Sequence, residues 1–220
     1  AGRGAVTTVA VVGLGNMGRP MAGRLVLAGH TVEGYDPSET ARAGLVEVGG
    51  RAHDLLTDAV SAAALVILML PNSTVVEAVV RDAGFTPRPG TLVVDMSSSE
   101  PRRTRELAAE LGARGLRLVD APVSGGVVRA LDGSLTVMAG GVDLDLDEAA
   151  PALAALGTVV RVGPVGSGHA VKALNNLLSA SHLLLASEAI AAGERFGLDP
   201  AVMLQVFNGS SGRSGSTDVK

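Results

Sequence analysis

The sequence lacks cysteine, and this absence excludes several kinds of chemistry. A chain of 220 residues without cysteine forms no disulfide, offers no thiolate to a metal and holds no cysteine nucleophile. Its four histidines do not show the spacing of a metal-binding motif such as H-E-x-x-H, so we predict no metal site. The longest hydrophobic run, Ala62 to Leu70, has the length of a core strand and is too short to span a bilayer.

The sequence also lacks any run of basic residues. Its formal net charge is -4, which argues against a nucleic-acid-binding surface. Because it shows neither a signal-peptide pattern nor a membrane-spanning run, we expect a soluble, cytoplasmic protein with no membrane partner. Hydrophobic residues make up 47% of the chain and charged residues 18%, so a substantial core can form.

A G-x-G-x-x-G motif stands between a strand-like run, Thr7–Val12, and a helix-like run, Met17–Ala28. In a dinucleotide-binding unit the first glycine allows a tight turn, and the second lets the backbone approach a pyrophosphate. The third glycine lets the helix pack close to the strand, and the helix N-terminus offers N–H groups to the anion. The predicted nucleotide-binding turn comprises Gly13, Leu14, Gly15, Asn16, Met17 and Gly18.

Strand-like and helix-like segments alternate from residue 7 to about residue 162. The strand candidates are rich in Val, Leu and Ile without polar alternation, which is typical of parallel strands buried on both faces. This alternation predicts an α/β fold with a doubly wound, mainly parallel sheet, whose ligands bind at the carboxyl ends of the strands. The predicted strands are Thr7–Val12, Thr31–Tyr35, Leu65–Leu70, Thr91–Asp95, Leu116–Val119, Leu135–Ala139 and Val159–Val162. The predicted helices are Met17–Ala28, Glu39–Leu45, Asp54–Ala62, Ser73–Val80, Pro101–Leu111 and Leu144–Leu156.

Asp36 directly follows the second predicted strand, Thr31–Tyr35, and lies 18 residues after Gly18. An acidic side chain at this spacing accepts hydrogen bonds from the ribose hydroxyls of NAD, whereas it repels the 2′-phosphate of NADP. No arginine follows immediately, so NAD is favoured over NADP as cofactor. The alternative interpretation is a turn-forming aspartate before Pro37.

Polar residues follow three further strands. Leu70, Pro71 and Asn72 come after one strand, and Ser97 and Ser98 come after the next. Serine and asparagine at such places also cap helices, and capping is compatible with ligand contact. Further on, Ser124, Gly125 and Gly126 predict an exposed loop. Its backbone amides and hydroxyl suit a carboxylate, and a flexible turn is an equally good interpretation.

A Gly- and Ser-containing segment, residues 163–168, separates these units from a long apolar helix predicted over His169–Phe196. We therefore predict two domains, residues 1–163 and 164–220. The helix has little polar surface, so we expect it to be buried between domains or subunits. A short helix, Pro200–Val206, and a polar loop follow it.

Lys172 and Asn176 share one face near the start of the long helix, and His169 lies near that face. A lysine at the positive end of a helix dipole that is also desolvated should have a lowered pKa, which suits a general acid/base. The alternative is a lysine that extends its amine to the domain surface, and the residues alone favour it slightly.

Taken together, these segments resemble the β-hydroxyacid dehydrogenase family, of the 3-hydroxyisobutyrate dehydrogenase type. The resemblance covers essentially the whole chain, in order. It rests on residues 13–18 with Met21 and Ala22, residues 70–72, 95–98, 120–126 and 138–141, residues 166–172, and Asn175 with Asn176.

The resemblance implies a Rossmann domain, a long interdomain helix and an all-α domain that commonly dimerises, so a homo-oligomer is expected through the helical domain. It implies that NAD lies over residues 13–18 with its ribose at Asp36. It also implies that Leu70, Pro71 and Asn72 border the cofactor, with Ser97 and Ser98 near the nicotinamide.

For the chemistry, the resemblance implies that Lys172 is the general acid/base and that Asn176 holds the substrate or the lysine in place. Ser124, Gly125 and Gly126 would bind the carboxylate of the substrate. The expected reaction is the oxidation of a short 3-hydroxy acid to a semialdehyde or keto acid, or the reverse.

Single positions distinguish this chain from two related groups of enzymes. The decarboxylating 6-phosphogluconate dehydrogenases carry a histidine where this chain has Asn175, and imine reductases usually lack the lysine found here at 172. The family also has a longer helical domain and a later lysine without counterpart here, so the α domain is expected to be truncated. This leaves two alternatives: a nucleotide-binding fragment without turnover, and a reductase of another small carbonyl acid such as tartronate semialdehyde.

Overall fold

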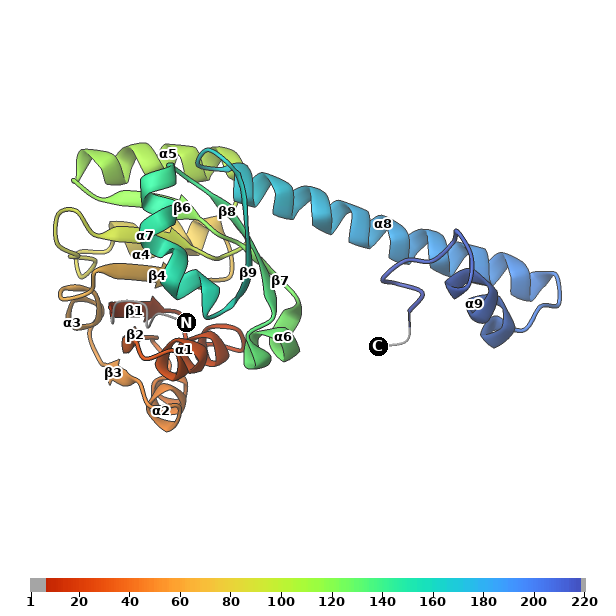
Figure 1. The fold of residues 1–220 in the computed structure, drawn as a ribbon, viewed down its shortest axis with the longest axis horizontal. Coiled ribbons are helices and arrows are strands. Elements are labelled where there is room, and N and C mark those ends of the chain that lie inside the picture. The colour runs from red at the N-terminus through yellow and green to blue at the C-terminus, as the bar shows by residue number, and fades with distance from the viewer. Residues whose placement is uncertain (1–6, 219–220) are drawn as a thin grey trace. The chain divides into compact units, whose positions relative to one another are not determined.

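The computed structural model describes residues 7–218 and divides the chain into two compact units, Ala1–Lys172 and Ala173–Lys220 (Figure 1). This division falls inside a long helix, nine residues beyond the boundary predicted at 163/164. The predicted domain boundary stays a prediction. In the first unit the strands are β1 (Thr8–Val12), β2 (Thr31–Tyr35), β3 (Arg51–His53), β4 (Leu65–Leu68), β5 (Leu92–Asp95), β6 (Arg117–Asp120), β7 (Val123–Ser124), β8 (Leu135–Gly140) and β9 (Gly157–Gly163). Its helices are α1 (Gly18–Leu27), α2 (Glu39–Glu47), α3 (Leu56–Val60), α4 (Ser73–Arg81), α5 (Pro101–Ala113), α6 (Gly126–Asp132) and α7 (Asp143–Ala154).

The strands form one mainly parallel sheet, as the sequence predicts. Its order is β3-β2-β1-β4-β5-β6-β8-β7, with β9 paired to β8. The pairs from β3 to β6 and the β8–β9 pair are parallel, whereas β8 runs antiparallel to β6 and β7. The order reverses at β1, which lies between β2 and β4, and a doubly wound sheet binds its ligand at such a point.

The core lies on both faces of this sheet because successive side chains of a strand point to opposite faces. On β1, Val9 and Val11 pack with α1, α2, α6 and α7, whereas Ala10 and Val12 pack with α3, α4 and α5. Helices therefore cover both faces, which explains why the central strands show no polar alternation.

The helix α8 (Ser167–Arg195) begins in the first unit and continues into the second, which also holds α9 (Pro200–Asn208). In the single chain the apolar face of α8 is exposed, so its predicted burial between domains or subunits stays a prediction. Leu177, Leu184 and Leu185 are 62%, 62% and 66% exposed. Burial of this apolar surface needs a second domain or subunit, which sequence pattern alone does not supply. Among the described residues, none of the helices is long and apolar enough to span a bilayer.

Three elements were not predicted. The edge strand β3 is short and polar, with a solvent-exposed Arg51 side chain, so it carries no hydrophobic signal. The strand β7 has two residues, and α6 starts at Gly126 inside the segment that was predicted to be a loop. Long-range pairing with β8 forms β7, and a local pattern does not reveal such pairing.

Candidate dinucleotide and substrate site

The turn between β1 and α1 has the geometry that the three glycines predict. Gly13 has a φ of +95°, and a Cβ there would collide with the carbonyl oxygen of Met69. A Cβ on Gly18 would collide with the carbonyl of Gly13, so the helix packs against the turn at the closest possible approach. A Cβ on Gly15 would meet nothing within 4 Å. Packing thus requires glycine at positions 13 and 18, whereas Gly15 faces open space.

That open space is a cavity of about 530 Å³ at the carboxyl ends of β1, β2 and β4. Its walls are mostly apolar, with glycine backbone at one end and Asp36 at its rim. The lining comprises Val12, Gly13, Gly15, Asn16, Met17, Gly18, Tyr35, Asp36, Pro37, Met69, Leu70, Pro71, Val75 and Val79. An apolar cleft with a few polar groups at a topological switch point fits a dinucleotide.

The carboxylate of Asp36 is fixed by two backbone donors. Its Oδ2 accepts the N–H of Leu14 at 2.8 Å, and its Oδ1 accepts the N–H of Ser38 at 2.8 Å. Leu14 itself is buried, so its N–H rather than its side chain serves the site. The nearby Arg42 donates to the carbonyl of Asp36 at 2.8 Å and pairs with Asp54 at 2.9 Å. Two hydrogen-bond acceptors are thereby held at the cavity, and the guanidinium of Arg42 beside them is already engaged.

The loops after β4 and β5 are tied together by buried serine hydroxyls. The N–H of Leu70 donates to Ser97 Oγ at 3.0 Å, and the N–H of Glu100 donates to Ser73 Oγ at 2.7 Å. Ser97 is fully buried, so its side chain shapes the cavity wall through Leu70. Ser98 is exposed on the same loop. The predicted proximity of both serines to a nicotinamide stays a prediction.

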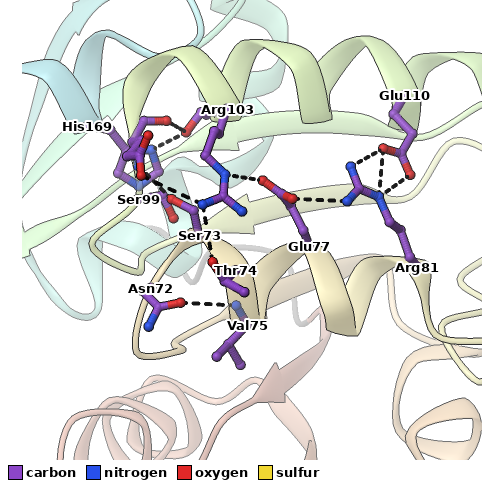
Figure 2. A network of polar contacts seen from close by, with 12 residues as sticks. Asn72, Ser73, Thr74, Val75, Glu77, Arg81, Ser99, Arg103, Glu110 and His169 are labelled. Carbon is purple, nitrogen blue, oxygen red and sulfur yellow. Dashed lines mark hydrogen bonds and ion pairs between the residues drawn. The ribbon is translucent and has the colours of Figure 1, made fainter.

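Charged residues reinforce the same two loops through α4 and α5 (Figure 2). Glu77 accepts from Arg103 at 2.6 Å and from Arg81 at 3.0 Å, and these hydrogen bonds, that of Arg103 foremost, lower the pKa of Glu77. Asn72 caps α4 by accepting the N–H of Val75 at 3.1 Å. The predicted capping role of Asn72 is thereby confirmed.

The segment predicted to be a loop for a carboxylate is a strand end followed by a helix start. Ser124 ends β7, Gly125 is the N-cap of α6 and Gly126 is its first residue. No described side chain caps this helix, and Gly125 and Gly126 are exposed. The predicted loop is therefore wrong in form, although exposed amides at a helix N-terminus remain suited to an anion. The side-chain carbons of Arg129 lie over Gly125.

Lys172 lies in the second turn of α8 and is half-buried, and this burial lowers the pKa of its ammonium group. Asn176 follows four residues later on the same helix, in the second unit. His169, three residues before Lys172, is 1% exposed, and its ring contacts Thr104 and the carbonyl of Ser97. It packs into the interior, so it is not available beside Lys172 as a ligand contact.

Sequence reasoning missed several cavity residues. Tyr35 and Met69 belong to strand ends whose positions the motif already suggests, and Val75 and Val79 lie four residues apart on α4. The helical spacing of the two valines was the available signal for a second wall of the cavity. The buried contacts of Asp120 had no such signal, because its partners Gly166 and His169 lie far along the chain.

The glycine turn, the fixed acidic residue after β2 and the cavity between them define the class of Rossmann-type dinucleotide-binding proteins. A family model described as the NAD binding domain of 6-phosphogluconate dehydrogenase matches residues 8–166. A second, described as NAD-binding of NADP-dependent 3-hydroxyisobutyrate dehydrogenase, matches residues 166–220.

Known proteins place the chain more narrowly. It is 38% identical over 208 residues to a probable 3-hydroxyisobutyrate dehydrogenase of Mycobacterium tuberculosis, which covers 94% of this chain and 71% of the relative. It is 39% identical over 215 residues to an NAD-dependent L-serine dehydrogenase of Pseudomonas aeruginosa, covering 96% and 72%. A solved M. tuberculosis 3-hydroxyisobutyrate dehydrogenase with L-serine has a TM-score of 0.91 and 37% identity, covering 96% and 73%. The chain belongs to the β-hydroxyacid dehydrogenase family of oxidoreductases.

Proposed function

We propose that this protein oxidises the hydroxyl of a short 3-hydroxy acid, such as 3-hydroxyisobutyrate, to the semialdehyde or keto acid with a nicotinamide dinucleotide, or catalyses the reverse reaction. The observation that carries the proposal is Lys172. Its amine is half-buried with a lowered pKa, in the same compact unit as the dinucleotide cavity. Such an amine exchanges a proton near neutral pH more readily than an ordinary lysine.

NAD is the proposed cofactor, with NADP less favoured. The carboxylate of Asp36, held by Leu14 and Ser38, would accept from the ribose hydroxyls and would repel a 2′-phosphate. The amides after Gly13, with the open space at Gly15, would receive the pyrophosphate. Relatives support either nucleotide, since one matching model is described as NADP-dependent and the L-serine dehydrogenase as NAD-dependent.

The proposed chemistry divides hydride and proton between two partners. When bound, the nicotinamide supplies the acceptor for the hydride of the carbinol carbon. Lys172 Nζ takes the hydroxyl proton as the C–O bond becomes a carbonyl, and it returns that proton in the reverse reaction. Asn176, on the same helix, would hydrogen-bond the substrate or the lysine and hold the geometry.

The substrate carboxylate is proposed to bind at the start of α6. There Ser124 supplies a hydroxyl and Gly125 and Gly126 supply backbone amides, on a helix that lacks a side-chain cap. An anion satisfies those amides and interacts favourably with the helix dipole. This placement would fix which carbon of the substrate is oxidised.

We also propose that the chain forms a homo-oligomer through its helical part. The supporting observation is the exposed row of leucines on α8, including Leu177 and Leu184. The division into a cofactor domain, residues 1–163, and a helical part, residues 164–220, belongs to the same proposal.

A substrate panel tests the function. The absorbance of reduced nicotinamide is followed with NAD or NADP and with 3-hydroxyisobutyrate, L-serine or glycerate, and lactate serves as the matched 2-hydroxy acid. We expect turnover with at least one 3-hydroxy acid and none with lactate, because a fixed carboxylate presents the wrong carbon of a 2-hydroxy acid. Nucleotide binding without turnover on any 3-hydroxy acid would instead identify a nucleotide-binding remnant.

A further inference from the structure

A buried charged cluster lies where the ends of β5 and β6 meet the start of α8. Asp95, Asp120 and His169 are 1%, 0% and 1% exposed. All three belong to the first compact unit, and the proposed reaction uses none of them. Buried charges are costly unless they are paired and hydrogen-bonded, so the contacts of this cluster show what it stabilises.

Asp120 holds the beginning of α8. Its Oδ1 accepts the N–H of Gly166 at 2.6 Å, and its Oδ2 accepts the N–H of His169 at 2.8 Å. Gly166 immediately precedes the helix and His169 is its third residue. N–H groups at these places have no partner within the helix, and a carboxylate there also lies at the positive end of the helix dipole.

Two glycines make room for this carboxylate and restrict its position. A Cβ on Gly140 would lie 2.7 Å from Asp120 Oδ1, and a Cβ on Gly168 would lie 2.9 Å from Asp120 Oδ2. Both distances are shorter than real Cβ atoms tolerate. The strand β8 and the helix α8 therefore enclose Asp120 on two sides, and the helix start has little freedom to rotate or slide.

The ring of His169 adds further contacts at the start of α8. We call Asp120 and His169 together the anchor of this helix. Thr104 Oγ1 lies 3.0 Å from the carbonyl oxygen of Glu100 and is hydrogen-bonded to His169 Nδ1 at 2.9 Å. His169 Nε2 lies 3.1 Å from the carbonyl oxygen of Ser97, which can only accept. Both ring nitrogens therefore have a polar partner, so the orientation of the ring is fixed.

The ring lies between two carboxyl groups. His169 Nδ1 is 3.6 Å from Asp120 Oδ2, and His169 Nε2 is 3.8 Å from Asp95 Oδ2. Asp95 also accepts from the N–H of Ser97 at 3.0 Å and the hydroxyl of Ser99 at 2.9 Å. Figure 2 shows the histidine at the end of the polar network that begins on α4 and crosses α5. The helix start is thus joined to the loop after β5.

We propose that Asp120 and His169 are positioning residues that fix the first turn of α8, and through it the direction and burial of Lys172. Lys172 lies three residues after His169, less than one helical turn away. A helix start without this anchor would fray, as helix ends do when their backbone groups lack partners. The inference rests on the proposed role of Lys172, but the anchor can be tested without turnover.

The test uses the full chain and three variants. Asp120→Asn keeps the size of the side chain but cannot accept from both N–H groups through two carboxylate oxygens. His169→Gln retains the backbone contact to Asp120 and is therefore expected to fold. Asp145→Asn is the matched control, because Asp145 is a largely buried carboxylate paired with Arg117 at 2.8 Å, away from α8.

The first readout is the titration of Lys172 by NMR of 13C-labelled lysine. The sequence has two lysines, Lys172 and Lys220, so a Lys220→Arg background leaves a single signal. Burial is the cause of the lowered pKa of Lys172. Loosening of the helix start should therefore raise that pKa toward the ordinary value of about 10.4, whereas mere loss of a nearby negative charge would lower it.

The second readout is kcat and the Kd of NAD. We expect Asp120→Asn and His169→Gln to raise the Lys172 pKa and to lower kcat by about tenfold or more, since small misplacements of a reacting group are costly. The Kd of NAD should stay within about twofold, because the cofactor cavity does not include these residues. Asp145→Asn should lower Tm but should leave the Lys172 pKa, kcat and the Kd of NAD unchanged.

An unchanged Lys172 titration or an unchanged kcat in a folded anchor variant would overturn the inference. If Asp120→Asn fails to fold, His169→Gln decides the question. If the wild-type protein turns over no 3-hydroxy acid, the proposed function fails, and the titration then decides alone whether the anchor sets the burial of Lys172.

Discussion

The hydrogen bonds and the burial of single side chains decide what chemistry each residue can perform. Asp36 is an ordinary aspartate until the N–H groups of Leu14 and Ser38 fix both of its oxygens at the rim of the cavity. Lys172 becomes a candidate proton acceptor because α8 leaves it half-buried. The sequence predicted the direction of this pKa change, but only the structure distinguishes partial burial from a lysine that extends into solvent.

The lowered pKa of Lys172 predicts a pH dependence. Oxidation of the hydroxyl requires the neutral amine, so kcat/KM in that direction should rise with pH and level off above the pKa of Lys172. Because burial lowers that pKa, the midpoint should lie below the ordinary lysine value of about 10.4. Reduction requires the protonated amine and should fall through the same midpoint. Initial rates across pH in both directions measure this, and parallel rather than opposite profiles would contradict it.

Asp36→Asn tests the cofactor preference. The amide oxygen can accept from Leu14 or Ser38, but its NH2 group then faces the other N–H and cannot accept. We expect the Kd of NAD to rise by about tenfold, the loss of roughly one hydrogen bond with a charged group, and the Kd of NADP to rise less because repulsion of the 2′-phosphate is removed. Fluorescence titration of the reduced nucleotides checks it. Equal weakening of both would remove Asp36 from the ribose.

At the scale of elements, the site depends on where strands end and helices begin. The cavity is bordered by the β1–α1 turn, the end of β2, and the loop after β4 with the helix α4 that follows. Buried serines and the Glu77–Arg103 pair hold the loops after β4 and β5 to each other (Figure 2). These ties act before any ligand arrives, so the cavity is largely pre-formed.

Substitutions at the glycines of the β1–α1 turn should affect folding and NAD binding differently. Gly15→Ala and Gly15→Val place atoms in open space, so each variant should fold with nearly unchanged Tm while NAD binding weakens progressively. Gly18→Ala should instead fail to fold stably, because its Cβ would overlap the carbonyl of Gly13. Gly112→Ala, on the exposed side of α5, is the control and should stabilise by up to about 1 kcal/mol without affecting NAD. Thermal unfolding and NAD titration separate the three cases.

The strongly patterned elements were predictable from sequence, and the rest depended on distant partners. The buried strands and amphipathic helices of the central sheet carry apolar runs, and their prediction is confirmed to within a few residues at the ends. By contrast, β7 exists because Val123 and Ser124 pair with β8, and β3 exists because residues 51–53 pair with β2. Local propensity does not encode such pairing.

The same limit applied to the site. Motif spacing predicted the glycines and Asp36, whereas Lys172 was predicted from its unusual charge together with the family resemblance. Asp120 and His169 are equally ordered, yet their partners lie 46 to 72 residues away along the chain. Their contacts appear only when β6, α5 and α8 come together in the fold.

At the scale of the whole molecule, the chain combines a well-packed cofactor unit with a helical unit rich in exposed leucine. The first contains both apolar clusters that cover the sheet. The second exposes Leu174, Leu178 and Leu183 by 58% or more. Exposed apolar surface of this extent is typical of interaction sites, and it supports the proposed homo-oligomer.

The central claim is that Lys172 exchanges a proton with a 3-hydroxy acid beside a bound nicotinamide. Its most direct test is the rate of NAD reduction by Lys172→Ala, measured with and without added methylamine. We expect a loss of about 10²- to 10⁴-fold in kcat, an almost unchanged Kd for NAD, and partial recovery with the small amine. Turnover close to that of the wild-type protein without any added amine would contradict it.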